Sequence, residues 1–88
     1  MTLQREAIRD TIRAKVKELA ADLGNDASGL TDDEILPVTG LLDSAAVLEL
    51  VVWYENAYDL QLKQEEINID NLGSVNAMTD YLLARKSV

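Results

Sequence analysis

The sequence predicts an all-α fold: a small bundle of three main helices, with a short helix between the second and the last and a long first loop. Two observations support it. Apolar residues recur at steps of three and four in three separate stretches, and turn-forming residues are concentrated in the segments between them. The 88 residues suit a single domain, so we expect one unit over residues 1–88.

The first stretch, residues 2–23, carries one apolar stripe between charged residues and predicts an amphipathic helix. The stripe consists of Ile8, Ile12, Val16, Leu19 and Leu23. Gly24 should end this helix, and the following segment up to Asp43 is rich in turn formers, including Pro37 and Gly40. We expect a long loop there, with one helical turn around Thr31–Ile35. Loops of this length are often functional.

A second helix is predicted to begin at Asp43 and Ser44, because both residue types are favoured at helix N-caps and residues 45–58 continue without a breaker. Its expected core face is formed by Val47, Leu50, Val51, Tyr54 and Tyr58. An adjoining face is formed by Ala45, Leu48, Glu49, Val52 and Glu55.

The remainder of the chain predicts one short and one longer helix. The short helix is expected near Gln64–Asn68 or Asp70–Leu72. Ser74 should then cap a last helix, which ends near Arg85 and Lys86, where cations suit a helix C-terminus. Its apolar positions at helical spacing are Val75, Met78, Tyr81 and Leu82.

Composition excludes several kinds of chemistry. The chain has no His and no Cys, so it has no His-based catalytic triad, Cys nucleophile, thiolate metal site or disulfide. We therefore expect that it is not an enzyme. No apolar run suits a signal peptide or a membrane span, which predicts a soluble, cytoplasmic monomer with no membrane partner.

The net charge of −8 is unevenly distributed along the chain. The interval from Glu18 to Leu62 holds ten acidic residues and no basic one. Such a surface repels nucleic acid and attracts a basic patch on a partner protein.

The candidate site is Gly40-Leu41-Leu42-Asp43-Ser44, which places a serine at the start of a helix after a flexible approach. A phosphate group on Ser44 would meet the free N–H groups and the positive dipole end of that helix. Taken alone, an Asp-Ser pair before a helix is most often only a cap.

The surrounding residues help to decide whether Ser44 is only part of a helix cap or a site of attachment. The segment Gly40–Ser44, followed by Val47–Val51, Glu55 and Tyr58, resembles the acyl carrier protein and peptidyl carrier protein family. Residues 70–78 are similar to the family's lead into its final helix. The sequence differs from the family at Ala45, where most members have a large apolar residue. The smaller side chain reduces the apolar area that a housekeeping transferase is expected to contact.

The resemblance implies a carrier whose Ser44 receives 4'-phosphopantetheine from coenzyme A, with Asp43 completing the Asp-Ser pair. It also implies that a partner-binding face, Ala45, Leu48, Glu49, Val52 and Glu55, is read by other enzymes. These partners would be a phosphopantetheinyl transferase, a cargo-loading ligase and a downstream transferase.

The cargo would be held as a thioester on the distal thiol of the arm. We expect Tyr54, Tyr58 and Tyr81 to lie close to the space that long acyl chains occupy in fatty-acid carriers, which favours a small cargo. The Gly-Leu-Leu-Asp-Ser form of the motif is similar to that of stand-alone carriers loaded with single amino acids. An activated amino acid is therefore the first expectation, and a short acyl chain is the alternative.

Two alternatives of other classes remain. The acidic segment from Asp22 to Glu34 suggests a calcium loop, but Gly24, Ala27 and Asp33 do not fit the ligand, glycine and glutamate positions of an EF-hand. The second alternative is an acidic helical adaptor that carries no prosthetic group.

Overall fold

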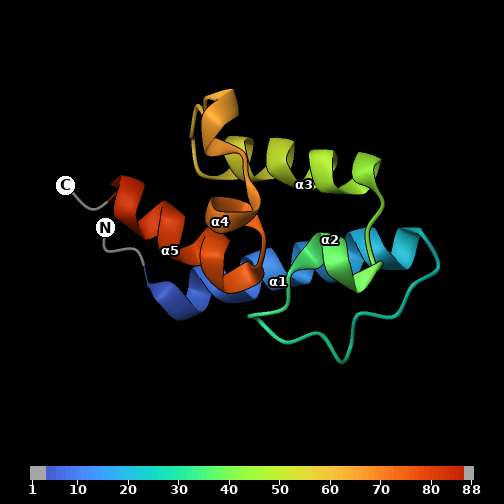
Figure 1. Ribbon diagram of the computed structural model, residues 1–88. Helices are drawn as coiled ribbons and strands as arrows, with labels where there is room; N and C mark the ends of the chain where they lie inside the picture. Colours follow the sequence, from blue (N-terminus) through green and yellow to red (C-terminus); the bar gives the residue numbers. More distant parts are fainter. Residues whose placement is uncertain (1–3, 87–88) are drawn as a thin grey trace.

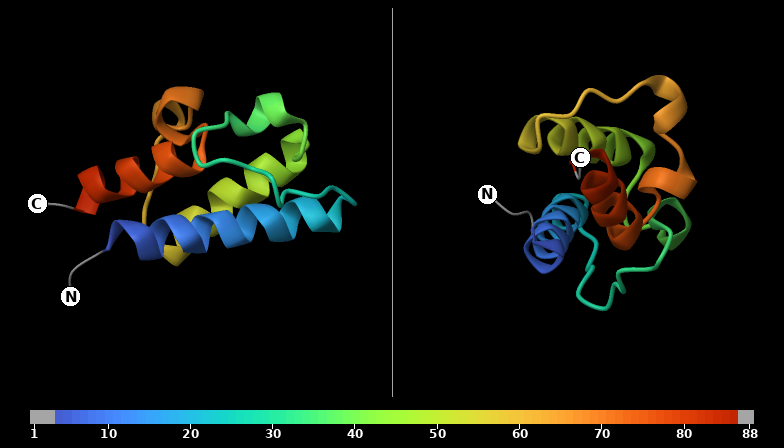
Figure 2. Two further views of the ribbon diagram at one scale, coloured as in Figure 1. Left: turned by 90° about the horizontal axis from the view of Figure 1, so that it is seen from below. Right: turned by 90° about the vertical axis from the view of Figure 1, so that its left-hand side faces the viewer.

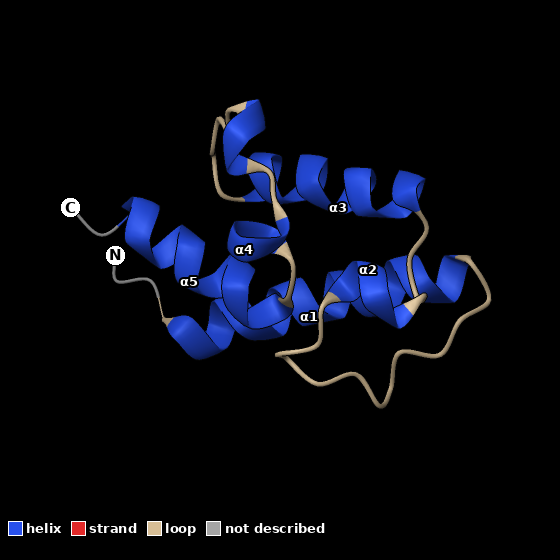
Figure 3. Cartoon of the chain, in the orientation of Figure 1, coloured by secondary structure: helices blue, strands red, loops and turns tan. Residues whose placement is uncertain are grey.

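The computed structural model describes residues 4–86, and within that range every regular element is helical (Figure 3). The all-α prediction is therefore confirmed. The elements are α1 Arg5–Asp22, α2 Leu36–Thr39, α3 Ser44–Ala57, the 3₁₀ turn η1 Gln64–Glu66, α4 Ile69–Leu72 and α5 Val75–Lys86. The predicted start of the first helix at Thr2 lies outside the described residues.

Three long helices form the body of the molecule. α3 and α5 both run back against the direction of α1, and α1 packs against each of them (Figures 1 and 2). The short helix α4 packs on α5. The start of α3 therefore lies at the opposite end of the molecule from the end of α5 (Figure 1).

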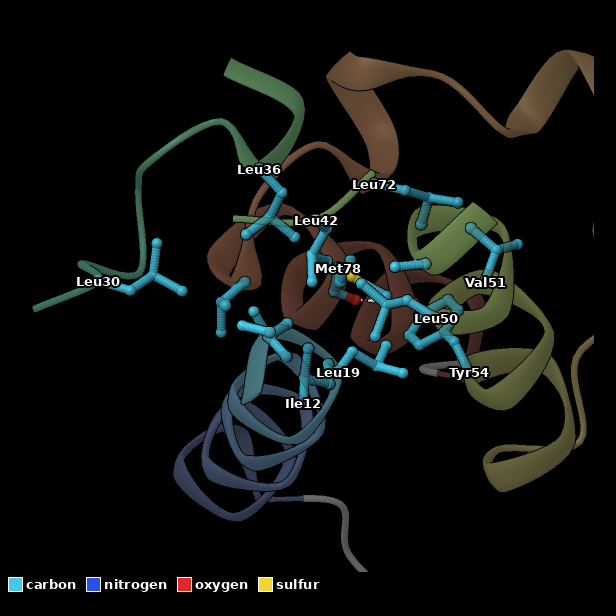
Figure 4. Packing of buried hydrophobic residues seen from close by; sticks show 14 of the residues in the cluster. Ile12, Leu19, Leu30, Leu36, Leu42, Leu50, Val51, Tyr54, Leu72 and Met78 are labelled. Atoms are coloured by element: carbon cyan, nitrogen blue, oxygen red, sulfur yellow. Dashed lines mark hydrogen bonds between the residues drawn. The ribbon is translucent and has the colours of Figure 1, made fainter. Parts of the chain in front are cut away.

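The core forms where the apolar stripes of the long helices meet (Figure 4). On α1 the predicted residues Ile8, Ile12, Val16 and Leu19 are all buried. The prediction for Leu23 was wrong, because its side chain is 43% exposed. α1 ends at Asp22, one residue before Leu23, and the chain then turns away from the core at Gly24.

The core face of α3 is rotated slightly from the predicted one. Leu50, Val51 and Tyr54 are buried as predicted, whereas Val47 and Tyr58 are only half-buried. Ala46 is buried instead, because it shares the i, i+4, i+8 stripe with Leu50 and Tyr54. Val47 and Tyr58 consequently lie at the edge of the buried stripe.

The helical turn in the first connection lies at α2, not at Thr31–Ile35 as predicted. Pro37 suits the first turn of a helix, and Gly40 ends α2 in the left-handed region with φ +73°. The predicted segment, Thr31–Ile35, does contain one contact of a capping box, because the N–H of Thr31 donates to Glu34 Oε1 at 2.9 Å. No helix follows this contact, and the segment forms only a turn.

Side-chain and backbone contacts fasten this connection to the bundle. Arg13 donates to the backbone carbonyl of Leu30 at 2.7 Å, and Leu36 donates its N–H to the carbonyl of Gly73 at 2.7 Å. Arg13 Nη1 also lies 3.3 Å from Asp32 Oδ1, and Arg9 Nε lies 3.6 Å from Asp32 Oδ2. The connection is long, but it is held at fixed points.

Both alternatives for the short helix are realised, as η1 and α4. The carboxylate of Glu66 accepts hydrogen bonds from the Tyr81 hydroxyl at 2.8 Å and from Arg85, which ties η1 to α5. Ser74 Oγ accepts the N–H of Ala77 at 3.0 Å, which confirms Ser74 as the cap of the last helix.

None of the helices described over residues 4–86 combines the length and the apolar character needed to cross a bilayer.

The buried hydroxyl of Tyr54 links α3 to α5, because it donates to the Met78 carbonyl at 2.7 Å. Burial raises the pKa of this hydroxyl well above its usual range, so it stays neutral. We expect Tyr54→Phe to lower the free energy of unfolding by about 1 kcal/mol, the net value of one buried neutral hydrogen bond. Urea unfolding measures this change.

The control is Leu48→Ala on the same helix, whose exposed side chain predicts a change within about 0.5 kcal/mol. Equal stability of Tyr54→Phe and wild type would contradict a role for this hydrogen bond.

Candidate functional site

Asp43 and Ser44 have separate roles at the start of α3. Asp43 is the N-cap, and its Oδ1 accepts the N–H of Ala46 at 2.8 Å. Ser44 is the first residue of α3, and its side chain is exposed. Because Asp43 supplies the cap, the hydroxyl of Ser44 is not needed for it.

The backbone around Ser44 suits a negatively charged group. The N–H groups in the first turn of a helix have no acceptor within the helix, and the dipole makes this end positive. In α3 the Asp43 carboxylate takes the N–H of Ala46, which leaves those of Ser44 and Ala45 beside the serine hydroxyl. A phosphodiester on Ser44 fits this environment.

The approach to Ser44 is anchored on both sides of Leu41. Asn25 Nδ2 donates to the Leu41 carbonyl at 2.8 Å, and the next residue, Leu42, is only 5% exposed. The Leu41 N–H donates to Thr39 Oγ1 at 3.2 Å. The serine is therefore presented from a fixed turn at one end of the bundle.

The predicted partner-binding face lies along the outer side of α3. Ala45 and Glu49 are exposed, and the exposed fractions of Leu48 and Val52 are 63% and 51%. Glu55 differs, because it is half-buried and its Oε2 accepts the N–H of Leu62 at 3.0 Å. Four of the five side chains thus face outward, and the fifth also anchors the segment after α3.

An apolar cavity of about 180 Å³ lies between α2, α3 and the segment around α4. Its walls are Leu36, Pro37, Val47, Leu50, Val51, Ile67, Asn68, Ile69, Leu72 and Gly73. Val47 and Val51 follow Ser44 by three and seven residues, so all three lie on one side of α3. Two residues of the cavity wall therefore share a helix face with Ser44, which does not itself line the cavity.

The three tyrosines lie outside this cavity. Tyr54, Tyr58 and Tyr81 are absent from the cavity walls. Tyr54 instead points to the backbone of α5, and the rings of Tyr54 and Tyr58 meet edge to face with centroids 5.7 Å apart.

The cavity was not predicted from the sequence. Its walls come from three elements, and Ile67 and Ile69 alternate with polar residues outside any helical stripe. The sequence did offer one sign of this cavity. Ile67 and Ile69 are large apolar residues in a polar connection, and their side chains are 39% and 54% exposed, which is typical of a binding surface.

The acidic segment after α1 has structural partners. Asp26 accepts the N–H of Ser28 at 2.9 Å, and this hydrogen bond lowers the pKa of the Asp26 carboxyl. Asp32 faces Arg9 and Arg13. Across residues 4–86, Asp and Glu side chains nowhere gather in a group of three or more that could hold a metal ion.

Comparisons with models of protein families, with curated proteins and with solved structures gave no match to this chain.

The cap on α3 predicts a stability difference between two substitutions of Asp43. Asp43→Ala removes the acceptor for the Ala46 N–H and should lower the free energy of unfolding by about 1 kcal/mol. Asp43→Asn keeps a side-chain oxygen at the same place and should retain most of that stability. Urea unfolding at neutral pH compares them, and equal losses would contradict a capping role.

Proposed function

We propose that this protein is a carrier that holds a small cargo as a thioester on a 4'-phosphopantetheine arm attached to Ser44. The observation that carries the proposal is the exposed Ser44 hydroxyl on the first turn of α3, a helix that Asp43 already caps. The motif around it, Gly40–Ser44, supports the same proposal by resemblance.

Attachment is a single transfer that a separate transferase catalyses. Ser44 Oγ attacks the phosphorus that bears pantetheine in coenzyme A, the bond to the departing adenosine bisphosphate breaks, and the serine proton passes to a base of the transferase. The product phosphodiester carries one negative charge beside the N–H groups of Ser44 and Ala45. When attached, the group supplies the thiol that holds the cargo.

The outer face of α3 supports recognition by basic partner enzymes. Asp43, Leu48 and Glu49 are all exposed, and no basic residue occurs in sequence between Glu18 and Leu62. Opposite charge on a partner speeds encounter and fixes orientation. Salt screens such contacts, so binding would be weak at high ionic strength, as release of a carrier requires.

For the cargo, an activated amino acid is the first candidate, on the resemblance of the Gly-Leu-Leu-Asp-Ser motif. A short acyl chain is the second candidate, and the aliphatic cavity that Val47 and Val51 of α3 help to line favours it. Its volume of about 180 Å³ suits a group near the size of benzene, since an engineered cavity of about 150 Å³ holds that molecule. Either cargo would be small.

The attachment site predicts a change in mass at one residue. Wild-type protein incubated with coenzyme A and a broad-specificity phosphopantetheinyl transferase should gain the mass of one arm, measured on the intact protein. Ser44→Ala should gain none. The matched control is Ser28→Ala, which removes an exposed loop serine and should be modified like wild type. A wild-type chain that stays bare would favour the acidic adaptor instead.

The cavity predicts a dependence of stability on cargo size. A hexanoyl group on the arm should raise the free energy of unfolding by up to about 3 kcal/mol over an acetyl group, because four additional methylenes enter an apolar space. A dodecanoyl group should add little more, since the volume admits about six carbons. Urea unfolding of the three loaded forms tests this, and equal stabilities would show that the cargo stays outside.

A further inference from the structure

One wall of the apolar cavity is formed by exposed side chains. Ile67 and Ile69 in this wall are 39% and 54% exposed, whereas Leu36 on α2 and Leu50 on α3 are each 2% exposed. The two isoleucines belong to the segment 63–71, which contains η1 and most of α4 and lies at the edge of the molecule away from α1 (Figures 1 and 2). A shift of this wall would leave the buried core residues in place.

The segment 63–71 is hydrogen-bonded mainly to itself. Asn68 Oδ1 accepts the N–H of Asn71 at 2.8 Å, and Asn71 Nδ2 donates to the Glu66 carbonyl at 3.0 Å. Asn68 Nδ2 donates to the Glu65 carbonyl, also at 3.0 Å. Because these bonds lie within the segment, they are kept when it moves as one unit.

Glu66 alone attaches a side chain of this segment to another element. Its Oε2 accepts the hydroxyl of Tyr81 at 2.8 Å and a hydrogen bond from Arg85, and both donors lie on α5. In the part of the chain that the structure describes, the other side chains of the segment make hydrogen bonds only within it or make none. Residues 63–70 are all exposed except Glu66. The polar attachment to α5 therefore depends on one carboxylate.

The residues on both sides of the segment are fixed. Before it, the N–H of Leu62 donates to Glu55 Oε2 at 3.0 Å. After it, Leu72 is 8% exposed, and the Gly73 carbonyl accepts the N–H of Leu36 at 2.7 Å. A movement of the segment would therefore begin and end at these points.

We infer that residues 63–71 form a lid over the apolar cavity and that the Glu66 carboxylate is the latch that holds this lid on α5. Opening of the lid moves Ile67 and Ile69 away from α3 and admits a small apolar group. The lid is a property of the fold, whereas its use in admitting an acyl cargo rests on the proposed function.

Native-state hydrogen exchange followed by NMR measures the opening of the lid. The N–H groups of Leu72 and Gly73 donate to the carbonyls of Asn68 and Ile69 at 2.9 and 2.8 Å, so these two bonds join fixed residues to the lid. Both amides should exchange through a local opening that depends weakly on urea, whereas the amide of Val16 in the core of α1 should exchange only on global unfolding. The same urea dependence for all three amides would overturn the lid.

Three variants test the latch. Glu66→Gln removes the charge that pairs with Arg85, and Tyr81→Phe removes the other donor. Each should speed exchange of the two lid-reporting amides about three- to tenfold, the value of one hydrogen bond. The matched control is Glu65→Gln, which removes the same charge from the adjacent exposed residue and should leave the rates unchanged. Wild-type rates in the first two variants would show that Glu66 is not a latch.

Benzene tests whether the lid covers the cavity, and it requires no arm. Its size suits an apolar cavity of about this volume. Benzene at a concentration equal to its Kd should about halve the exchange rates of the Leu72 and Gly73 amides, because it occupies the closed cavity. Rates that do not respond to benzene would overturn the inference. A chain that accepts no arm but shows the local opening and the benzene response would end the proposed function and support the lid.

Discussion

The site depends on how the connection between α1 and α3 is fastened to the helices. Leu30, Leu36 and Leu42 recur every six residues along it, and all three are 5% exposed or less (Figure 4). Backbone carbonyls at or beside two of them accept side-chain donors: Leu30 from Arg13, and Leu41 from Asn25. A connection anchored in this way delivers Ser44 to a defined place, although little of it is helical.

The basic residues of α1 also take part in holding the molecule together. Basic side chains of α1 face partners inside the molecule: Arg5 bonds Asp80 on α5, and Arg9 and Arg13 face Asp32 in the connection. These exposed or half-exposed pairs contribute little stability each. Their larger effect is that the positive charge stays near α1, while the outer face of α3 carries acids without basic neighbours in sequence.

Periodicity predicted the three long helices because their core-facing residues repeat within one element, as Ile8, Ile12, Val16 and Leu19 do. Periodicity did not predict the features that depend on contacts between elements, namely the position of α2 and the cavity. The helical turn was expected too early because Pro37 and Gly40 predict turns, whereas Pro37 lies in the first turn of α2 and Gly40 ends it. The cavity was missed because its walls come from elements far apart in the chain, and spacing within one helix carries no information about them.

At Ser44 the sequence pattern left two meanings open, since an Asp-Ser pair can cap a helix or present a hydroxyl. The geometry separates them by residue: Asp43 accepts the Ala46 N–H, and Ser44 lies one position later with its side chain in solvent. A serine used as the cap would have its oxygen directed at the helix backbone and would be a poor acceptor for a transferred group. Placing the carboxylate first therefore leaves the hydroxyl of Ser44 accessible to solvent.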